Sequence, residues 1–211
     1  MSLSDPSVSV LMPVRDESEL LASAMESMLA QTLDDFEIVL VDDGASNETR
    51  DAIVTWGERD TRVTVLRQGP LGIVTALEHG RSIARGRYLA RMDADDIAHP
   101  DRLAIQFDLM EISPGLAGCG CGVEYFPREV VRDGARRYEA WLNALVSPEQ
   151  IAASIFVECP LAHPTFFLRA NVVESVGGYV DRGWPEDYDL VLRLWEAGHR
   201  LGKVPGALHS W

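Results

Sequence analysis

Three clusters of acidic side chains carry the most distinctive chemistry in this sequence. They are Asp42-Asp43, the run Asp93-Ala94-Asp95-Asp96, and Glu186-Asp187. Oxygen ligands are what Mg²⁺ and Mn²⁺ prefer, and one carboxylate with substrate phosphates is a common way to hold Mg²⁺. A carboxylate in the first turn of a helix is kept ionised, which suits a general base. The clusters therefore point to a divalent metal and to proton transfer.

Each cluster also has a purely structural interpretation. The run 93–96 is compatible with a turn that caps a helix starting near Pro100. Asp42-Asp43-Gly44 has the composition of an ordinary turn. Acids such as Glu186-Asp187 at a helix start are favoured by the helix dipole alone, by about 0.3–1 kcal/mol. These alternatives stay open for each cluster taken singly.

Two other uses of the run that begins at Asp93 fail on spacing. A calcium-binding loop needs glycine at its sixth position and glutamate at its twelfth, where this chain has Ala98 and Ala104. A phosphatase with an aspartate nucleophile needs threonine or valine four residues on and a well-placed lysine. The chain has Ile97 at that position and only one lysine, Lys203.

Composition excludes several classes of protein. The formal net charge of −14 argues against a nucleic-acid partner. The three cysteines, Cys119, Cys121 and Cys159, form no disulfide framework, so a reducing, cytoplasmic setting is expected. A zinc site made by these cysteines and His163 is disfavoured. The sequence shows no signal peptide, and no apolar run reaches the ~18 residues of a membrane span, which leaves peripheral membrane contact open.

The elements that must position the clusters alternate between strand and helix in the first hundred residues. Strands are predicted at 8–14, 36–41, 63–66 and 87–92. Helices are predicted after Asp16, at 47–59 and at 72–84. Asp16 and Glu19 form a capping-box-like pair at the start of the first helix. This alternation predicts a parallel, doubly wound sheet. Ligands of such sheets bind beyond the carboxyl ends of the strands. Asp42-Asp43 and the run 93–96 both follow strands, so we expect them at one edge.

The second half is less regular. Helices are predicted at 101–112 and 185–197, strands at 115–126 and 165–168, another strand just before the end, and helix plus loop at 128–148. In the helix 185–197, the spacing of Tyr188, Val191, Leu192 and Trp195 predicts one buried side.

Five segments, taken in order, resemble the family-2 glycosyltransferases. They are VSVLMPVRDE (8–17), FEIVLVDDGASNET (36–49), ARGRYLARMDADD (84–96), HPTFFLRANVVESVGGY (163–179) and WPEDYDLVLRLWEAG (184–198). The resemblance implies a GT-A fold: one α/β domain with a Rossmann-like, mostly parallel central sheet flanked by helices. It divides the chain into a nucleotide-binding half (1–100) and an acceptor and catalytic-base half (101–211). Members of the family usually continue further, so we expect this chain to be truncated at its C-terminus.

The resemblance also implies roles for individual residues at the nucleotide. Pro13, Val14, Arg15 and Glu17 would line the nucleotide, and Asp42 or Asp43 would contact its base, usually uracil.

The remaining roles concern the metal and the proton. Asp93 and Asp95 match the family's DxD motif; Asp93 would approach the ribose and the metal, and Asp95 would bind the Mn²⁺ or Mg²⁺ that bridges the diphosphate. A late histidine ligand, here His209, is a further expectation, and Asp187 matches the catalytic base with Glu186 as its neighbour.

These roles describe an inverting, metal-dependent hexosyltransferase. It would move a sugar from a nucleoside-diphosphate sugar, most often UDP-linked, to a hydroxyl of a glycan or another acceptor, as in polysaccharide or glycoconjugate synthesis. Two alternatives are a nucleotidyltransferase of related fold, whose basic glycine-rich loop is not found at 13–17, and a sugar-nucleotide-binding module without turnover. The sequence does not specify the sugar, the acceptor or the oligomeric state.

Overall fold

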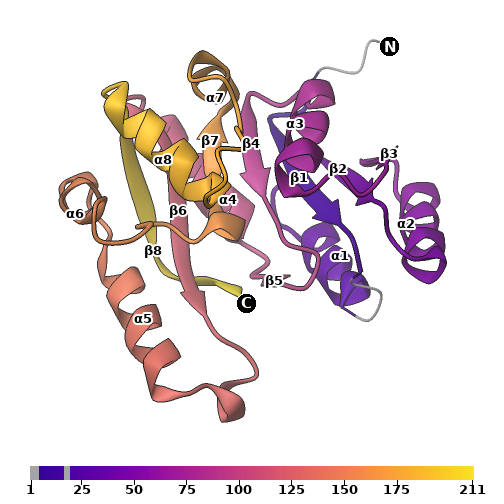
Figure 1. Ribbon diagram of the computed structural model, residues 1–211, viewed down its shortest axis with the longest axis horizontal. Coiled ribbons are helices and arrows are strands. Elements are labelled where there is room, and N and C mark those ends of the chain that lie inside the picture. The colour runs from indigo at the N-terminus through magenta and orange to yellow at the C-terminus, as the bar shows by residue number, and fades with distance from the viewer. Residues whose placement is uncertain (1–4, 17–19) are drawn as a thin grey trace.

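The first four strands form the parallel half of one sheet. The computed structural model describes residues 5–16 and 20–211 (Figure 1). The strands are β1 (Val8–Val14), β2 (Phe36–Asp43), β3 (Val63–Gln68) and β4 (Tyr88–Arg91), in the order β3-β2-β1-β4. Every residue of β1, β2 and β4 is buried, as expected where helices cover both faces of a sheet, whereas β3 lies at the edge and is partly exposed.

Three helices connect these strands. They are α1 (Leu21–Leu29), α2 (Asn47–Arg59) and α3 (Ile73–Ile83). The predicted helix after Asp16 is present as α1, and Leu21, Ala24, Met25 and Met28, spaced at helical intervals, form its buried face. The helix begins later than the predicted capping pair implies, and Glu19 of that pair lies outside the described residues.

The second half extends the sheet with mixed pairing. β7 (Phe167–Arg169) is antiparallel to β4 and to β6 (Leu116–Glu124), β8 (Arg200–Ser210) is parallel to β6, and the short β5 (Ile97–Ala98) is antiparallel to β8. The complete order is β3-β2-β1-β4-β7-β6-β8-β5, and one sheet therefore runs through the whole domain. The predicted single-domain α/β fold with a mostly parallel central sheet flanked by helices is confirmed.

The remaining helices belong to the second half. They are α4 (Arg102–Ile112), η1 (Arg128–Val130), α5 (Asp133–Ala144), α6 (Pro148–Ser154), η2 (His163–Thr165), α7 (Ala170–Ser175) and α8 (Glu186–Glu196). In Figure 1, α5 and α6 lie at the end of the molecule away from α2, and α8 lies across the β6–β7 region of the sheet. Sequence reasoning did not predict α6, α7 or β5 as separate elements, because each is too short to show a period.

The buried side of α8 differs from the predicted one. The structure buries Asp189, Leu190, Val191 and Leu194, while Trp195 is 42% exposed. Asp189 lies on this buried side, and its carboxylate accepts from Arg193 Nε at 2.6 Å, one turn further on. A buried aspartate is acceptable only when it is paired in this way.

Candidate active site

The carboxyl ends of β1, β2 and β4 surround a cavity of about 330 Å³. Its lining residues come from all three strand ends and from the start of α3; they are Pro13, Val14, Arg15, Asp43, Ile73, Asp93, Ala94 and Asp95. Two acidic clusters that are 50 residues apart in the sequence therefore meet at one edge of the sheet, as the parallel topology predicted. Glu17, which was expected beside them, lies outside the described residues.

Asp42 and Asp43 point to different places. Successive side chains of a strand alternate between its faces. Asp42 is fully buried and its carboxylate accepts from Arg50 Nε at 3.1 Å, so it acts inside the fold. Asp43 lines the cavity, and its carboxylate accepts from the backbone amides of Leu71 (2.8 Å) and Gly72 (3.0 Å). Of the two candidates for the nucleotide base, only Asp43 faces the cavity.

A buried arginine holds the first aspartate of the run 93–96. The side chain of Arg91 is 3% exposed and pairs with Asp93, whose side chain remains 33% exposed. Burial, followed by the negative charges of Asp96 and Asp93, raises the pKa of Asp95. One arginine thus faces several carboxylates, and this excess of negative charge is what a bound cation would relieve.

His209 lies in the protein interior, at the end of β8. Its Nδ1 lies 2.7 Å from Nη1 of Arg102, and its Nε2 lies 2.7 Å from Oδ2 of Asp96. A guanidinium only donates, so Nδ1 must accept and the proton of the neutral ring sits on Nε2, facing Asp96. Burial lowers the pKa of His209 well below its ordinary value, which keeps the ring neutral. In this arrangement neither nitrogen offers a free lone pair, and the expected metal-ligand role of His209 stays a prediction.

The donor set at the cavity suits a hard divalent cation. Asp93 and Asp95 offer carboxylate oxygens at the cavity wall. Within residues 5–16 and 20–211, no three acidic, histidine or cysteine side chains are grouped as a complete metal site. Mg²⁺ and Mn²⁺ accept such partial protein ligation, because substrate phosphates and water fill the other positions. The residues present therefore fit a metal that binds together with a phosphate-bearing ligand.

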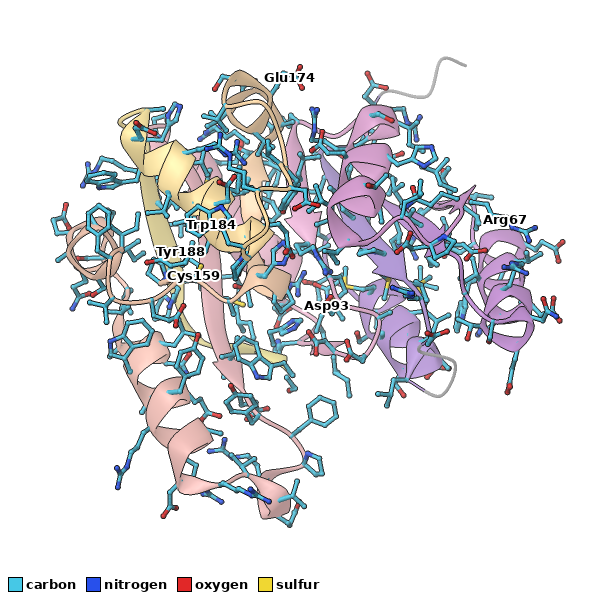
Figure 2. The ribbon with its side chains drawn as sticks, viewed as in Figure 1. Arg67, Asp93, Cys159, Glu174, Trp184 and Tyr188 are labelled. Atoms are coloured by element: carbon cyan, nitrogen blue, oxygen red, sulfur yellow. The ribbon has the colours of Figure 1, made fainter. Side chains whose placement is uncertain are left out.

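The third acidic cluster begins α8. Glu186 Oε1 lies 3.4 Å from Nδ1 of His163, whose other nitrogen lies 3.2 Å from the Tyr179 hydroxyl. Asp187 lies beside the Cys159 thiol, and burial raises the pKa of its carboxyl group. Figure 2 shows Cys159, Trp184 and Tyr188 around this end of α8, with Asp93 on the neighbouring part of the sheet. A half-buried carboxylate with a raised pKa has the properties of a general base.

A groove connects the cavity with the start of α8. It measures about 410 Å³ and lies between α3 and the loop before α8; its lining residues are Leu71, Gly72, Ile73, Val74, Thr75, Asp181, Gly183, Trp184, Pro185 and Glu186. Ile73 lines both the groove and the cavity at β1, so the two are neighbours. All three acidic clusters thus contribute to one continuous depression. Ile73 is 38% exposed and lies on the wall that the two hollows share.

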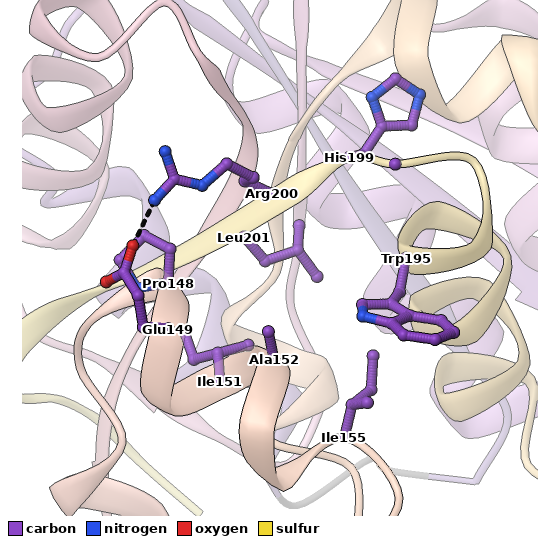
Figure 3. Close-up of a pocket in the computed structure, with 10 residues that line it drawn as sticks. Pro148, Glu149, Ile151, Ala152, Ile155, Trp195, His199, Arg200 and Leu201 are labelled. Carbon is purple, nitrogen blue, oxygen red and sulfur yellow. Dashed lines mark hydrogen bonds and ion pairs between the residues drawn. The ribbon is translucent and has the colours of Figure 1, made fainter.

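A separate cavity lies at the other end of α8. It measures about 240 Å³, is mainly apolar, and is lined by residues such as Ile155, Trp195 and Leu201, with an ion pair between Arg200 and Glu149 at its rim (Figure 3). None of the acidic clusters contributes to it. It therefore does not belong to the candidate active site.

A family model identifies the chain. The model of glycosyl transferase family 2 matches residues 9–177. The chain belongs to glycosyl transferase family 2. The predicted family is thereby confirmed, and with it the glycosyltransferase class of enzyme. No helix among the described residues is both long and apolar enough to cross a bilayer.

Similar proteins include three from bacteria. The amylovoran biosynthesis glycosyltransferase AmsE of Erwinia amylovora is 32% identical over 92% of this chain and 71% of its own length. The putative glycosyltransferase EpsE of Bacillus subtilis (strain 168) is 31% identical over 98% of this chain and 73% of its own length. An uncharacterized glycosyltransferase of Haemophilus influenzae is 26% identical, and the chain spans 61% of it.

Solved structures support the fold. Residues 1–349 of S. aureus TarS superpose with a TM-score of 0.77 at 14% identity, over 97% of this chain and 60% of that one. The mannosyltransferase PcManGT of Pyrobaculum calidifontis, in complex with GDP-Man and Mn²⁺, superposes with a TM-score of 0.76 at 18% identity, over 99% of this chain and 57% of that one. TarS has also been solved with UDP-GlcNAc. The chain spans somewhat more than half of each of these structures.

Proposed function

We propose that the protein is an inverting, metal-dependent hexosyltransferase that uses a nucleoside-diphosphate sugar, with UDP as the expected nucleotide. The observation that carries the proposal is the continuous depression that joins Asp43, the pair Asp93/Asp95, and Glu186, the residue next to Asp187. Its two ends match the two needs of the reaction, which are a site for a charged diphosphate and a base for an acceptor hydroxyl. The nucleotide complexes of PcManGT and TarS support a nucleotide-sugar donor.

The nucleotide half of the site lies at the strand ends of the first hundred residues. Pro13, Val14 and Arg15 would line the nucleotide, and Asp43 would accept a hydrogen bond from its base or its ribose. Asp93 and Asp95 would hold Mn²⁺ or Mg²⁺ against the diphosphate, where the cation would offset the charge that grows on the leaving group.

The acceptor half supplies the base. Asp187 takes the proton of the acceptor hydroxyl as that oxygen forms a bond to the anomeric carbon. The bond between the anomeric carbon and the diphosphate oxygen breaks on the opposite face, and the nucleoside diphosphate leaves. One displacement inverts the configuration and needs no covalent enzyme intermediate. Glu186, held by His163, lines the groove that leads to the diphosphate and would position the donor sugar.

The first test measures donor binding. UDP-, GDP- and dTDP-sugars are screened by thermal shift with and without Mn²⁺. At least one of them should raise the melting temperature, and only when the metal is present. If no nucleotide sugar stabilises the protein in a metal-dependent way, the proposed donor site is wrong.

The second test separates turnover from binding. Asp187→Asn keeps the size and polarity of the side chain but removes the base. It should reduce transfer by roughly 10²–10⁴-fold and leave the donor Kd nearly unchanged. Glu196→Gln, an exposed acid at the other end of the same helix, is the matched control and should behave as the unaltered protein. If Asp187→Asn binds donor normally and transfers at the full rate, the base is assigned wrongly.

A further inference from the structure

Four aromatic side chains form a cluster beside the proposed base. They are Tyr125, which follows β6, Tyr138 and Trp141 of α5, and Trp211, which follows β8. The rings of Tyr125 and Trp211 have centroids 5.1 Å apart and meet edge to face. The ring of Tyr138 lies 5.8 Å from that of Trp141 and 6.5 Å from that of Trp211. We call these four residues the aromatic cluster.

The cluster rests on a small core of its own. Tyr138, Trp141 and Trp211 pack against buried Val123, Leu142 and Ala162. All four aromatic side chains are nevertheless only partly buried, so each keeps exposed ring surface. The core fixes where the rings lie and leaves part of them available for contact with a ligand.

The position of the cluster relates it to the reaction. Ala162, on which the cluster packs, directly precedes His163, whose Nδ1 lies 3.4 Å from Glu186 Oε1 at the start of α8. Burial, followed by the charge of Glu158, raises the pKa of Tyr138 to about 12, and Asp187 acts in the same direction. Trp211 stands two residues after His209, whose imidazole contacts Asp96 at 2.7 Å. The cluster therefore packs on the segment that contacts the start of α8, and its Trp211 closely follows the residue that contacts Asp96.

The donor occupies a different side of the base. The groove that reaches the diphosphate cavity is lined by Glu186 and by the start of α3, whereas Asp187 lies beside Cys159, three residues before Ala162, on which the aromatic cluster packs. In the proposed displacement, donor and acceptor approach the reacting carbon from opposite faces. An acceptor on the cluster would bring its hydroxyl to Asp187 from the side that the donor leaves free.

We propose that the aromatic cluster, with Tyr138 and Trp211 at its centre, is the acceptor subsite and that the acceptor is an uncharged saccharide. The inference rests on the proposed transfer reaction. One face of a sugar ring is made of C–H groups that pack well against aromatic rings, while its hydroxyls hydrogen-bond to phenol and carboxylate oxygens. The cluster supplies the rings and the Tyr138 hydroxyl, and the exposed Glu158 supplies a carboxylate. These acidic surroundings disfavour a phosphorylated acceptor.

The test measures saccharide binding and does not depend on turnover. Methyl β-D-glucoside, methyl β-D-galactoside, methyl α-D-mannoside and cellobiose are titrated by calorimetry into the protein, in the presence of Mn²⁺ and UDP. We expect saturable binding of at least one of them. Trp211→Ala and Tyr138→Ala should weaken that binding by roughly tenfold, in keeping with the loss of an aromatic contact. Donor binding by thermal shift should be retained in both variants.

Two further variants keep the test decisive. Trp211→Leu preserves an apolar side chain on the small core, so it should fold, yet it should lose the saccharide as Trp211→Ala does. Trp195→Ala removes a more exposed tryptophan at the far end of α8, where it packs against Phe156 with centroids 5.0 Å apart, and it should bind the saccharide normally.

The outcomes separate the two proposals. If none of the saccharides binds, or if Trp211→Leu and Trp195→Ala bind them equally well, the acceptor subsite is wrong. If donor binding with Mn²⁺ is observed in that case, the proposed function still stands. If saccharide binds through Trp211 and Tyr138 but no nucleotide sugar binds, the subsite stands as a saccharide site and the transfer reaction is wrong.

Discussion

Arg102 donates to Nδ1 of His209 at 2.7 Å, in a part of the protein where both side chains are fully buried. The same guanidinium donates to the backbone oxygens of Arg91 (2.7 Å) and Pro164 (3.1 Å). Arg102 therefore ties α4 to the strand that precedes Asp93 and to the end of β8. It also fixes the tautomer of His209 that faces Asp96. This buried arginine links the scaffold to the acidic run 93–96.

The first prediction concerns the stability that this link provides. Arg102→Met keeps an unbranched side chain in the buried position but removes the guanidinium, which leaves two carbonyls and the His209 nitrogen without their donor. The free energy of unfolding should fall by about 2–5 kcal/mol. Urea unfolding measures the change. Arg137→Met, at an exposed position of α5, is the control and should stay within about 0.5 kcal/mol of the unaltered protein. An equally small effect of Arg102→Met would show that the network contributes little.

The second prediction concerns a glycine at the entry to β4. A Cβ on Gly86 would lie 2.4 Å from the backbone nitrogen of Ser9 and 2.7 Å from the carbonyl carbon of Val8, both in the neighbouring strand region. Backbone cannot move aside as a side-chain tip can, so Gly86→Ala should lower the free energy of unfolding by about 1–3 kcal/mol or more. A Cβ on Gly115 meets nothing within 4 Å, and Gly115→Ala is the control for the same measurement.

The sequence predicted the part of the site that depends on regular elements. The strands with Asp42-Asp43 and with Asp93 have strong apolar runs, so their order and their common edge followed from the parallel topology. The roles within each pair did not follow, because the distinction between Asp42 and Asp43 rests on Arg50, which is eight residues away, and on amides of the loop before α3. The groove wall at Trp184 and the aromatic cluster join residues from separate elements and loops that are far apart in the sequence. Their contacts appear only when the chain is folded.

The third prediction concerns the pH dependence of stability. Burial raises the pKa of Glu37, but hydrogen bonds from Ser9 and Arg85 outweigh it, so the pKa lies below the usual 4.5. A lowered folded-state pKa contributes stability above the unfolded pKa, and this contribution is lost as the pH falls through the folded value. Glu37→Gln should therefore be less stable than the unaltered protein at pH 7, by about 1–3 kcal/mol. The free energies of unfolding of the variant and of the unaltered protein, measured by urea titration, should converge below pH ~4. A difference in free energy that stays constant with pH would contradict this account.

The fourth prediction concerns the pH dependence of transfer. Burial is the main cause that raises the pKa of Asp187, and the charge of Glu158 acts in the same direction, whereas hydrogen bonds from backbone and from Cys159 oppose them. The base must be ionised, so kcat should fall on acidification at a higher pH than an ordinary aspartate would allow. Glu158→Gln removes one like charge and should shift this acid limb to lower pH. An unchanged profile in Glu158→Gln would mean that another group controls it.

The fifth prediction separates Asp42 from Asp43 by one substitution in each. Asp43→Asn keeps an oxygen that accepts from the amides of Leu71 and Gly72 but loses the charge that faces the cavity. The donor Kd should rise by roughly tenfold with little change in melting temperature. Asp42→Asn instead weakens the buried contact with Arg50, so the melting temperature should fall while donor affinity in the folded protein is retained. If both variants lose the donor equally, the two carboxylates act together at the nucleotide, and the distinction drawn from their burial is wrong.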